Sequence, residues 1–352
     1  MNSSEVAAPS KTPLTGVGRV PLLIAAVALA VGIVTLSMTW RYRAAHPQRP
    51  VAMAVRLALS TTPHAALLML AAEKDYLGDE GLDVTIVPVS HGKTALDLLA
   101  RGEVDLATAA EVPFVTAVLD RQPLSILASM LSVSDEMAIV ARRDRGIAVP
   151  ADLLGKRVGV PRGTSAEYFL WALLIRHRLA RDGVTLVDLP PGRLADELAR
   201  GRIDAASTWQ PVRQDAESAL GAQGISFTAP AAYTVSHVVV GRTDYLHEHA
   251  EMSRRFVRAL LKAERFNRLH ADESLGIVAR RLKVDADALR PSWKSLAFRV
   301  NLLQSQLVTM EDEADWAVAG RPAASAPTPN FLPHLYLDAL LEEQPDRVTV
   351  AH

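Results

Sequence analysis

Two stretches of this sequence follow the same order, and their similarity decides the fold. RVGVPRGTSAEYFLWALLIRHRLARDGVTLVDLPPGRLADELARGRIDAASTWQP (157–211) repeats the plan of RLALSTTPHAALLMLAAEKDYLGDEGLDVTIVPVSHGKTALDLLARGEVDLATAAEVP (56–113). The run Leu-Ala-Arg-Gly ends at Gly102 and again at Gly201, and an acidic residue follows each run, at Asp105 and Asp204. A unit of about 100 residues is too long for a solenoid repeat. The sequence therefore predicts two similar lobes.

Within each repeat, short apolar strands alternate with amphipathic helices. In the first repeat RLALS, LDVTIVPV and VDLATAA have the character of strands, while HAALLMLAAEKDYL and KTALDLLARG have helical spacing. This alternation predicts an α/β layer structure with a mainly parallel sheet in each lobe. Ligands of such sheets lie beyond the carboxyl ends of the strands. We therefore expect a cleft between the lobes, lined by the loops that follow the strands.

Composition excludes several classes of function. The formal net charge of −1 gives no attraction for nucleic acid, and no nucleic-acid-binding motif is present. The absence of cysteine excludes disulfides, thiolate metal sites, a cysteine nucleophile and lipoprotein acylation. The ten histidines are scattered without metal-ligand spacing, so we expect no metal site and no cofactor.

The amino terminus contains a candidate membrane span. VPLLIAAVALAVGIVTLSMTW (20–40) has no charged residue over roughly one bilayer thickness of helix. It is longer than the apolar core of a cleaved signal peptide, and arginines follow it. We expect an uncleaved signal anchor at 20–40, a cytoplasmic leader at 1–19 and a linker at 41–52. Cleavage near Ala52-Met53-Ala54 is the alternative, which would leave a soluble periplasmic protein.

The turn at Gly163, Thr164 and Ser165 is the first candidate ligand site. It joins a strand to a helix, where the first amides lack partners within the helix and the helix dipole favours an anion. Gly163 allows close approach of the backbone, and the two hydroxyls add hydrogen-bond donors. The alternative is an ordinary helix N-cap, with Glu167 completing a capping box.

The equivalent turns of the first repeat supply the opposite wall of the expected cleft. Thr61 and Thr62 precede a helix with Pro63 at its start, and His64 is a candidate hydrogen-bonding group or a surface residue. His91 follows the next strand and faces either the cleft or solvent. The Gly-Lys-Thr sequence after it is not a phosphate-binding loop, because Val87 stands where that motif requires glycine.

Two further strand ends carry candidate ligand-binding side chains. Glu111 in the first repeat would suit an ammonium group or a hydrogen-bond donor. Trp209 in the second repeat offers a flat apolar wall or a core side chain, and Gln210 can donate or accept. No catalytic residue is expected: GTSAE fails the GxSxG pattern, because Glu167 replaces its last glycine, and no triad is ordered around it.

Six stretches in order resemble a known family. AAEKDYLGDEGLDVTIVPVSHGKTALDLLARGEVDLATA, ADLLGKRVGVPRGTSAEYFLWALL, LARGRIDAASTWQPV, FVRALLKAERFNRLHADESLGIVARRL, EDEADWAV and NFLPHLYLDALLEEQPDRVTV cover most of residues 55–350. Together they resemble solute-binding proteins of the nitrate, sulfonate and taurine class of ABC importers, a group that includes relatives of thiamine-precursor binding proteins. Two features of this chain are unusual in the family: the candidate transmembrane anchor and the lack of cysteine.

The resemblance implies a type II periplasmic-binding-protein fold with a hinge and an interlobe ligand cleft. Lobe I would comprise 53–140 plus 237–352, and lobe II would comprise 141–236. The implied protein is a monomer on the outer side of the cytoplasmic membrane. It would bind a small polar or anionic organic molecule, without catalysis, and deliver it to an ABC permease with its ATPase.

Two alternative functions stay open on the same fold. One is a ligand-sensing receptor that acts through a membrane partner, and the other is an enzyme similar to the pyrimidine synthases. The crossovers between the lobes give weaker candidate residues: Asp135 or Glu136 faces the ligand or a solvated hinge, and Tyr233 and His237 flank the return.

Overall fold

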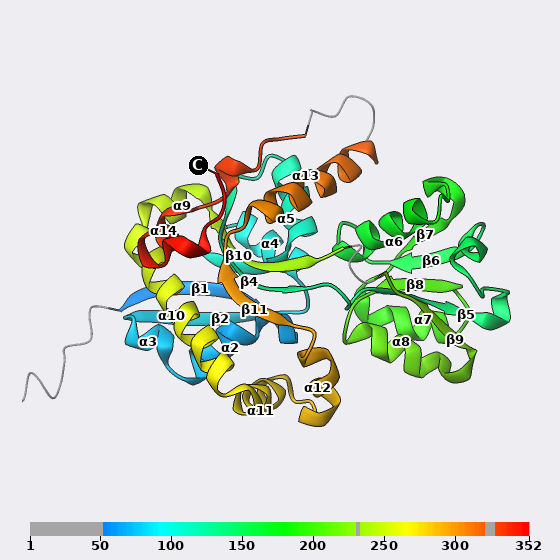
Figure 1. Ribbon diagram of the computed structural model, residues 1–352, viewed down its shortest axis with the longest axis horizontal. Helices are drawn as coiled ribbons and strands as arrows, with labels where there is room; N and C mark the ends of the chain where they lie inside the picture. Colours follow the sequence, from blue (N-terminus) through cyan, green and yellow to red (C-terminus); the bar gives the residue numbers. More distant parts are fainter. Residues whose placement is uncertain (1–51, 230–232, 321–327, 352) are drawn as a thin grey trace, which may run out of the picture. The chain divides into compact units, whose positions relative to one another are not determined.

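The computed structural model describes residues 52–229, 233–320 and 328–351, and their strands form two separate sheets (Figure 1). The first sheet has the order β11-β4-β10-β3-β1-β2 and the second the order β7-β6-β8-β5-β9. The strands of the first sheet are β1 (Met53–Ser60), β2 (Leu82–Val89), β3 (Leu106–Ala110), β4 (Leu124–Val133), β10 (Val235–Arg242) and β11 (Ala297–Asn301). Those of the second are β5 (Ala138–Arg142), β6 (Arg157–Val160), β7 (Thr185–Asp188), β8 (Ala205–Thr208) and β9 (Gly224–Phe227).

The two repeats form equivalent halves of these sheets. β2, β1 and β3 pair in parallel, as do β7, β6 and β8, and each triplet is bordered by an antiparallel strand, β10 or β5. The sequence prediction of two similar lobes is therefore confirmed by the strand order. Each sheet is mixed, however, and not mainly parallel as expected. The reason is that β10 and β5 enter directly after a crossover from the other sheet and run against their neighbours.

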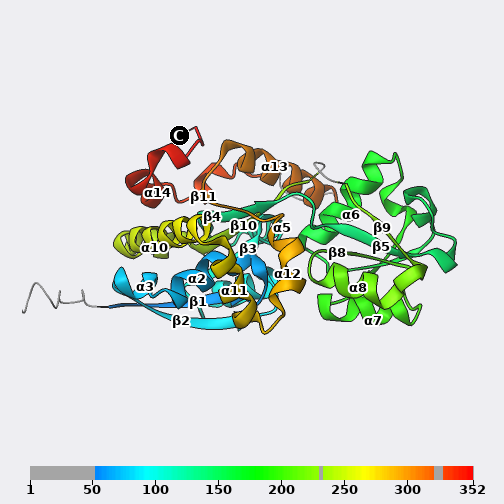
Figure 2. The same cartoon turned by 60° about the horizontal axis from the view of Figure 1, so that its bottom comes forward.

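Helices cover both faces of each sheet (Figures 1 and 2). The α-helices of the first lobe are α2 (Ala66–Glu73), α3 (Tyr76–Asp79), α4 (Gly92–Ala100), α5 (Glu111–Leu119), α9 (Thr243–Glu248), α10 (Ala250–Leu269), α11 (Ala271–Leu282), α12 (Ala286–Trp293), α13 (Gln304–Ala319) and α14 (Asp338–Glu343). Those of the second are α6 (Ser165–Arg176), α7 (Leu194–Ala199) and α8 (Val212–Leu220). α10 packs against α2 and α3, α5 packs against α4 and α13, and α7 packs against α8.

Two crossing segments join the sheets. The chain leaves β4 at Val133 and enters β5 at Ala138, and it leaves β9 at Phe227 and enters β10 at Val235. β5 thus spans residue 140, where the sequence placed a lobe boundary, and β10 begins two residues before the other expected boundary, at 237. In the first crossing segment, Ser134 and Asp135 are exposed, while Glu136 and Met137 are buried.

The repeated Leu-Ala-Arg-Gly run is a helix-ending motif. Gly102 adopts a φ of 69° and Gly201 a φ of 68°, the left-handed conformation that favours glycine. After α4 the amides of Gly102 and Glu103 donate to the carbonyls of Leu99 and Leu98, at 3.0 Å each. This is the Schellman arrangement, and the corresponding bonds follow α7. The sequence repeat therefore encodes the same chain reversal twice.

The repeated aspartate fixes the strand that follows each reversal. Asp105 Oδ2 accepts from the backbone N of Arg56 at 2.8 Å, and the Arg56 guanidinium donates to both carboxylate oxygens. Asp204 binds Arg157 in the same way, with its Oδ2 at 2.9 Å from the backbone N. Each aspartate thus holds the first strand of its repeat beside the third, which aligns their carboxyl ends.

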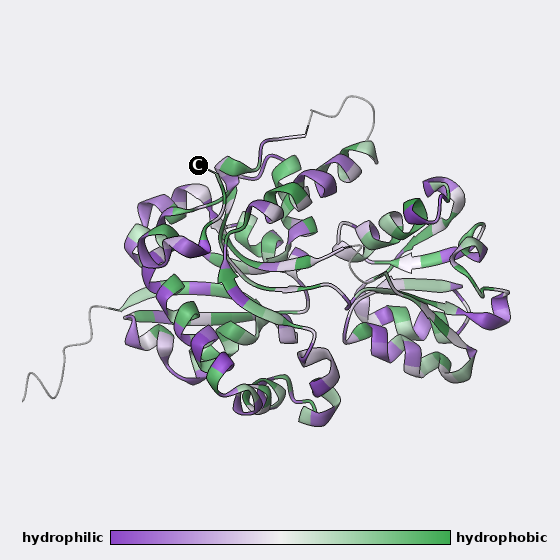
Figure 3. Cartoon of the chain, viewed as in Figure 1, coloured by the Kyte–Doolittle hydropathy of each residue, from purple (hydrophilic) through white to green (hydrophobic). Residues whose placement is uncertain are grey.

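Apolar side chains fill the layers between sheets and helices, and Figure 3 shows that α2 and α5 are apolar over most of their length. One cluster of buried residues belongs to both lobes: it contains Leu131 and Val133 of β4, Ile139 of β5 and Phe169 of α6. It also contains Trp316 of α13, whose carbonyl oxygen accepts from Arg181 of the second lobe at 3.3 Å. The hinge region therefore has an apolar core of its own.

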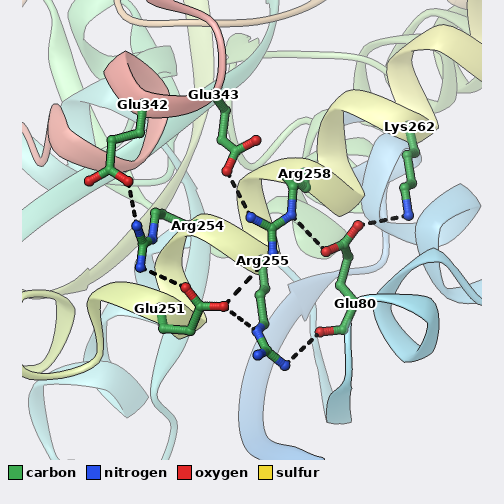
Figure 4. Close-up of polar contacts among 8 residues, drawn as sticks. All are labelled: Glu80, Glu251, Arg254, Arg255, Arg258, Lys262, Glu342 and Glu343. Carbon is green, nitrogen blue, oxygen red and sulfur yellow. Dashed lines mark hydrogen bonds and ion pairs between the residues drawn. The ribbon is translucent and has the colours of Figure 1, made fainter. Parts of the chain in front are cut away.

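The last described α-helix, α14, is held by ion pairs along α10 (Figure 4). Arg258 of α10 binds Glu343 at 2.8 Å and Glu80 at 2.7 Å, and Lys262 also binds Glu80 at 2.7 Å. Partly exposed pairs of this kind contribute little individually, about 0–1 kcal/mol each. Because they share partners, they fix the position of α14 against α10 and α3.

The helix-ending glycines generate a stability prediction. Gly102→Ala places a side chain at a φ of 69° with no atom within 4 Å of the new Cβ, so only backbone conformation opposes it. We expect the free energy of unfolding to fall by about 1 kcal/mol. Gly192→Ala is the matched control, because its Cβ would also meet open space and its φ is outside the left-handed region. Equal stability of the two variants in urea unfolding would contradict the assignment.

Candidate functional site

Strand ends from both lobes meet around one cavity. The turns after β1, β2 and β6 each lead into a helix, and the first residues of those helices face a common space. The described residues that line it are Ser60, Thr62, His64, Ser90, His91, Gly92, Lys93, Thr108, Ala109, Ala110, Pro113, Met130, Glu136, Met137, Thr164, Ser165, Trp209, Val235 and His237. Both lobes, the first crossing segment and the start of the return strand β10 therefore contribute to the cavity.

Six of the ten candidate ligand-binding residues line this cavity: Thr62, His64, His91, Thr164, Ser165 and Trp209. The other four, Thr61, Glu111, Gly163 and Gln210, are not among the lining residues. Thr61 is exposed, and its hydroxyl donates to the carbonyl of Val89 at 3.3 Å. Gln210 instead borders a second cavity, on whose wall His64 and Glu136 also lie.

The hydroxyls of the second-lobe turn have different roles. Thr164 Oγ1 donates to the carbonyl of Pro161 at 2.6 Å. Glu167 accepts from the amide of Gly163 at 2.7 Å, so the capping box named as the alternative is not formed: the carboxylate binds the residue before the N-cap. Ser165 Oγ is buried and has no hydrogen-bond partner among the described residues. Ser165 is thus the hydroxyl that remains available to a ligand.

The first-lobe turn is held by its own side chains. Thr62 Oγ1 lies 3.2 Å from Ser60 Oγ and 3.1 Å from His64 Nδ1, and Pro63 starts the short helix η1 (Pro63–Ala65) as expected. Because Ser60, Thr62 and His64 all line the cavity, this network presents a preformed polar wall.

A cationic side chain that was not among the predicted site residues lines the cavity. Of the described residues that line the cavity, Lys93 alone is a lysine or arginine, and its Nζ donates to the carbonyl of Arg162 in the other lobe at 3.3 Å. His91 lies beside it, with Nδ1 at 2.9 Å from Thr94 Oγ1. Burial, together with the charge of Lys93, lowers the pKa of His91, so this imidazole is neutral near pH 7.

Glu136 and two histidines form a buried cluster at the cavity wall. His64 Nε2 lies 2.5 Å from Glu136 Oε2, and His237 Nε2 lies 3.6 Å from Glu136 Oε1. The imidazole rings are stacked, with centroids 4.0 Å apart and planes at 2°. Burial alone would raise the pKa of Glu136, but the two histidines outweigh it and lower this pKa to about 2. Burial, with the charge of His64, lowers the pKa of His237 to about 4.

The members of this cluster are distant in the sequence, with His64 and Glu136 72 residues apart. Glu136 and His237 were noted only as residues of the two crossovers. No local spacing joins them, because one stands after β1, one in the first crossing segment and one in β10. Their chemistry suits a metal ion, as two imidazoles and a carboxylate are common ligands.

A pair of acidic residues, Glu111 and Glu313, is buried near the cavity. Glu111 was expected to face the cleft, but its carboxylate accepts from the amide of Ser236 at 3.0 Å and its other oxygen has no partner among the described atoms. Glu313 of α13 accepts from the hydroxyl of Tyr233 at 2.6 Å. Burial raises the pKa of Glu111 to about 7. Burial, together with the charge of Glu111, raises the pKa of Glu313 well above its usual range.

Two α/β lobes, joined by two crossing segments around a shared cavity, define a periplasmic-binding-protein fold, as the sequence predicted. A family profile described as NMT1/THI5 like matches residues 62–274, more than half of the chain, and the chain belongs to this family. The resemblance inferred from the six sequence stretches is confirmed.

Individual relatives agree with this assignment. The taurine-binding periplasmic protein of Escherichia coli (strain K12) is 26% identical over 199 residues, 55% of this chain and 60% of that protein. A putative aliphatic sulfonates-binding protein of Bacillus subtilis (strain 168) is 23% identical over 259 residues, 70% of this chain and 75% of that protein. The structure of the alkanesulfonate-binding protein SsuA from Xanthomonas axonopodis pv. citri, bound to MOPS, has a TM-score of 0.70 at 18% identity. The structural alignment covers 82% of this chain and 99% of the SsuA chain, which shows a common fold.

The candidate membrane span at 20–40 lies outside the described residues. Among the helices that the structure does describe, none is long and apolar enough to cross a bilayer.

The buried carboxyl pair generates a prediction for the pH dependence of stability. A carboxyl whose pKa is raised on folding takes up a proton, so stability decreases as pH rises from the ordinary pKa near 4.5 toward the raised value. One such proton corresponds to a slope of about 1.4 kcal/mol per pH unit. We expect Glu313→Gln, which keeps an acceptor for Tyr233, to lose about this slope between pH 5 and 8 in urea unfolding.

The matched control for this change is Glu311→Gln, on the exposed side of the same helix. Its slope should equal that of the unchanged protein. If Glu313→Gln also leaves the slope unchanged, Glu313 is ionised in the folded state and the argument fails.

Proposed function

We propose that this protein is the extracytoplasmic solute-binding component of an ABC importer. One observation carries the proposal: a single cavity receives residues from both lobes, from the first crossing segment and from the return strand β10. A molecule bound there contacts both lobes, so binding would favour the conformation in which they are close together. The proposed moving units are the two lobes expected from the sequence, 53–140 plus 237–352 and 141–236.

The proposed ligand is a small polar or anionic organic molecule. The Lys93 ammonium and the free Ser165 hydroxyl are donors on opposite lobes, and the amides at the start of α4 and α6 favour an acceptor group. Trp209, Met130 and Met137 offer apolar contact area in the same cavity. The relatives named for taurine and aliphatic sulfonates support a ligand with one compact anionic group.

Binding by these residues needs no chemical step. The names of the relatives are those of binding proteins, and the chain contains no cysteine nucleophile. A solute-binding protein of this kind would work as a monomer that docks on a membrane permease. The permease, with its ATPase, is the proposed partner.

The ligand assignment is tested by a thermal-shift screen with taurine, alkanesulfonates, nitrate and pyrimidines. We expect at least one compound to raise the melting temperature, because a ligand that binds only the folded state stabilises it. For that compound, Ser165→Ala should weaken the affinity about 2- to 10-fold in calorimetry, the effect of losing one hydrogen bond. Trp209→Ala should weaken it further, because it removes apolar contact.

The control for this measurement is Ser218→Ala, an exposed serine of α8 in the same lobe. Its affinity should match that of the unchanged protein. Unaltered affinity in both Ser165→Ala and Trp209→Ala would show that the compound binds elsewhere.

We further propose that residues 20–40 anchor the protein in the cytoplasmic membrane with the lobes outside. The support is the uncharged apolar run of the sequence. The full chain should then sediment with membranes and resist carbonate extraction. A soluble periplasmic product whose first residue lies near 50 would instead show cleavage by signal peptidase.

A further inference from the structure

Three groups with metal-ligating atoms meet at the wall of the cavity. His64, Glu136 and His237 each present one ligand atom, and these atoms lie within 4.8 Å of one another. His64 and Glu136 are buried, with 4% of each side chain exposed, and both also border the second cavity on the other side of the wall. The cluster therefore stands between two spaces from which an ion could enter.

The orientation of His64 is suited to a metal ligand. Its Nδ1 lies 3.1 Å from Thr62 Oγ1, which can accept a hydrogen bond from that nitrogen, while Nε2 points at Glu136. A hydrogen bond from the second ring nitrogen to a fixed oxygen is the usual support of a metal-bound histidine. Thr62 is itself positioned by Ser60 at 3.2 Å. A metal ion bound between His64 Nε2 and Glu136 would replace their direct contact.

His237 supplies the third ligand atom. Its Nε2 is buried and has no hydrogen-bond partner among the described residues, an arrangement that calls for an explanation. The two imidazoles are now parallel at 4.0 Å, and one ion cannot lie in both ring planes while they are parallel. Because His64 is held through Thr62 and no hydrogen bond holds His237 Nε2, His237 is the ring that turns to bind the ion.

We propose that His64, Glu136 and His237 form a binding site for a divalent transition-metal ion of the zinc type. Two imidazoles and one carboxylate are a known ligand set for zinc, and three protein ligands leave a fourth position open. That position faces the cavity, where a carboxylate, sulfonate or water oxygen would complete the coordination. The metal site does not depend on the proposed function. Only the binding of a solute at the fourth coordination position rests on that function.

The proposal is tested with zinc and cobalt ions on the full chain after removal of metals with a chelator. We expect one zinc ion per chain in calorimetry. Cobalt should give the intense visible absorption bands of a four-coordinate ion. His237→Gln should weaken zinc binding about 100-fold or more, since it removes one of three ligands.

His177→Gln is the matched control, because His177 is exposed on lobe II and far from the cluster in the fold. Circular dichroism separates loss of binding from loss of folding, and His237→Gln should fold normally because glutamine keeps a group that can donate to Glu136 Oε1, which lies 3.6 Å from His237 Nε2. Glu136→Gln provides a second variant of the same cluster. Equal zinc affinity in His237→Gln and the unchanged protein, or no zinc binding at all, would overturn the proposal.

The organic-ligand screen is repeated with chelator present, so that the two proposals fail separately. If an organic compound binds but zinc does not, the metal site is wrong and the solute-binding function stands. If zinc binds at the cluster and no organic compound does, the metal site stands and the proposed ligand class is wrong.

Discussion

A buried carboxylate, Glu136, is the group on which the functional region depends. A charge removed from water is tolerated only when it is paired, and Glu136 meets this condition through His64 at 2.5 Å. The pair joins the first crossing segment to the turn after β1, and His237 adds the return strand β10. Three distant parts of the chain are therefore fixed together where the cavity is formed. A change in any one of them alters the surroundings of the charge.

Duplication explains how the rest of the cavity is positioned. In both repeats a Schellman turn reverses the chain after a helix, and an aspartate then fixes the next strand to the first one. The carboxyl ends of these strands lie at one edge of each sheet, so the helices that follow begin at that edge. The two lobes present these helix starts to the same space. Ser165 and Lys93 thus line the same cavity although they belong to different lobes.

The layer behind the cavity gives the hinge a second buried polar network. Glu111 binds the amide of Ser236, and Glu313 binds Tyr233 of the return crossover. These carboxyls lie near an apolar cluster shared by both lobes, which includes Trp316 of α13. Burial favours their neutral form, so this network can remain packed near neutral pH without a matching cation. The hinge is therefore supported from lobe I by α13 as well as by the two crossing segments.

The sequence by itself determined the features that arise from short-range patterns. It predicted the two similar lobes from the repeated Leu-Ala-Arg-Gly run and the α/β class from the alternation of strands and helices. It also predicted the strand-to-helix turns that carry Thr62, His91 and Ser165, because a glycine or hydroxyl at such a turn has a local physical role. The expected direction of Glu111 was different from the observed one, since the rotation of a helix about its axis is set by what packs on it.

Only the tertiary structure decided which of these features meet. The mixed sheets follow from β5 and β10, which enter each sheet from the other lobe, and no local pattern indicates that exchange. The cluster of His64, Glu136 and His237 likewise joins residues from three elements with no common spacing. A sequence pattern reports interactions between neighbours along the chain. The pairing of a buried charge depends on which distant segments the fold brings into contact.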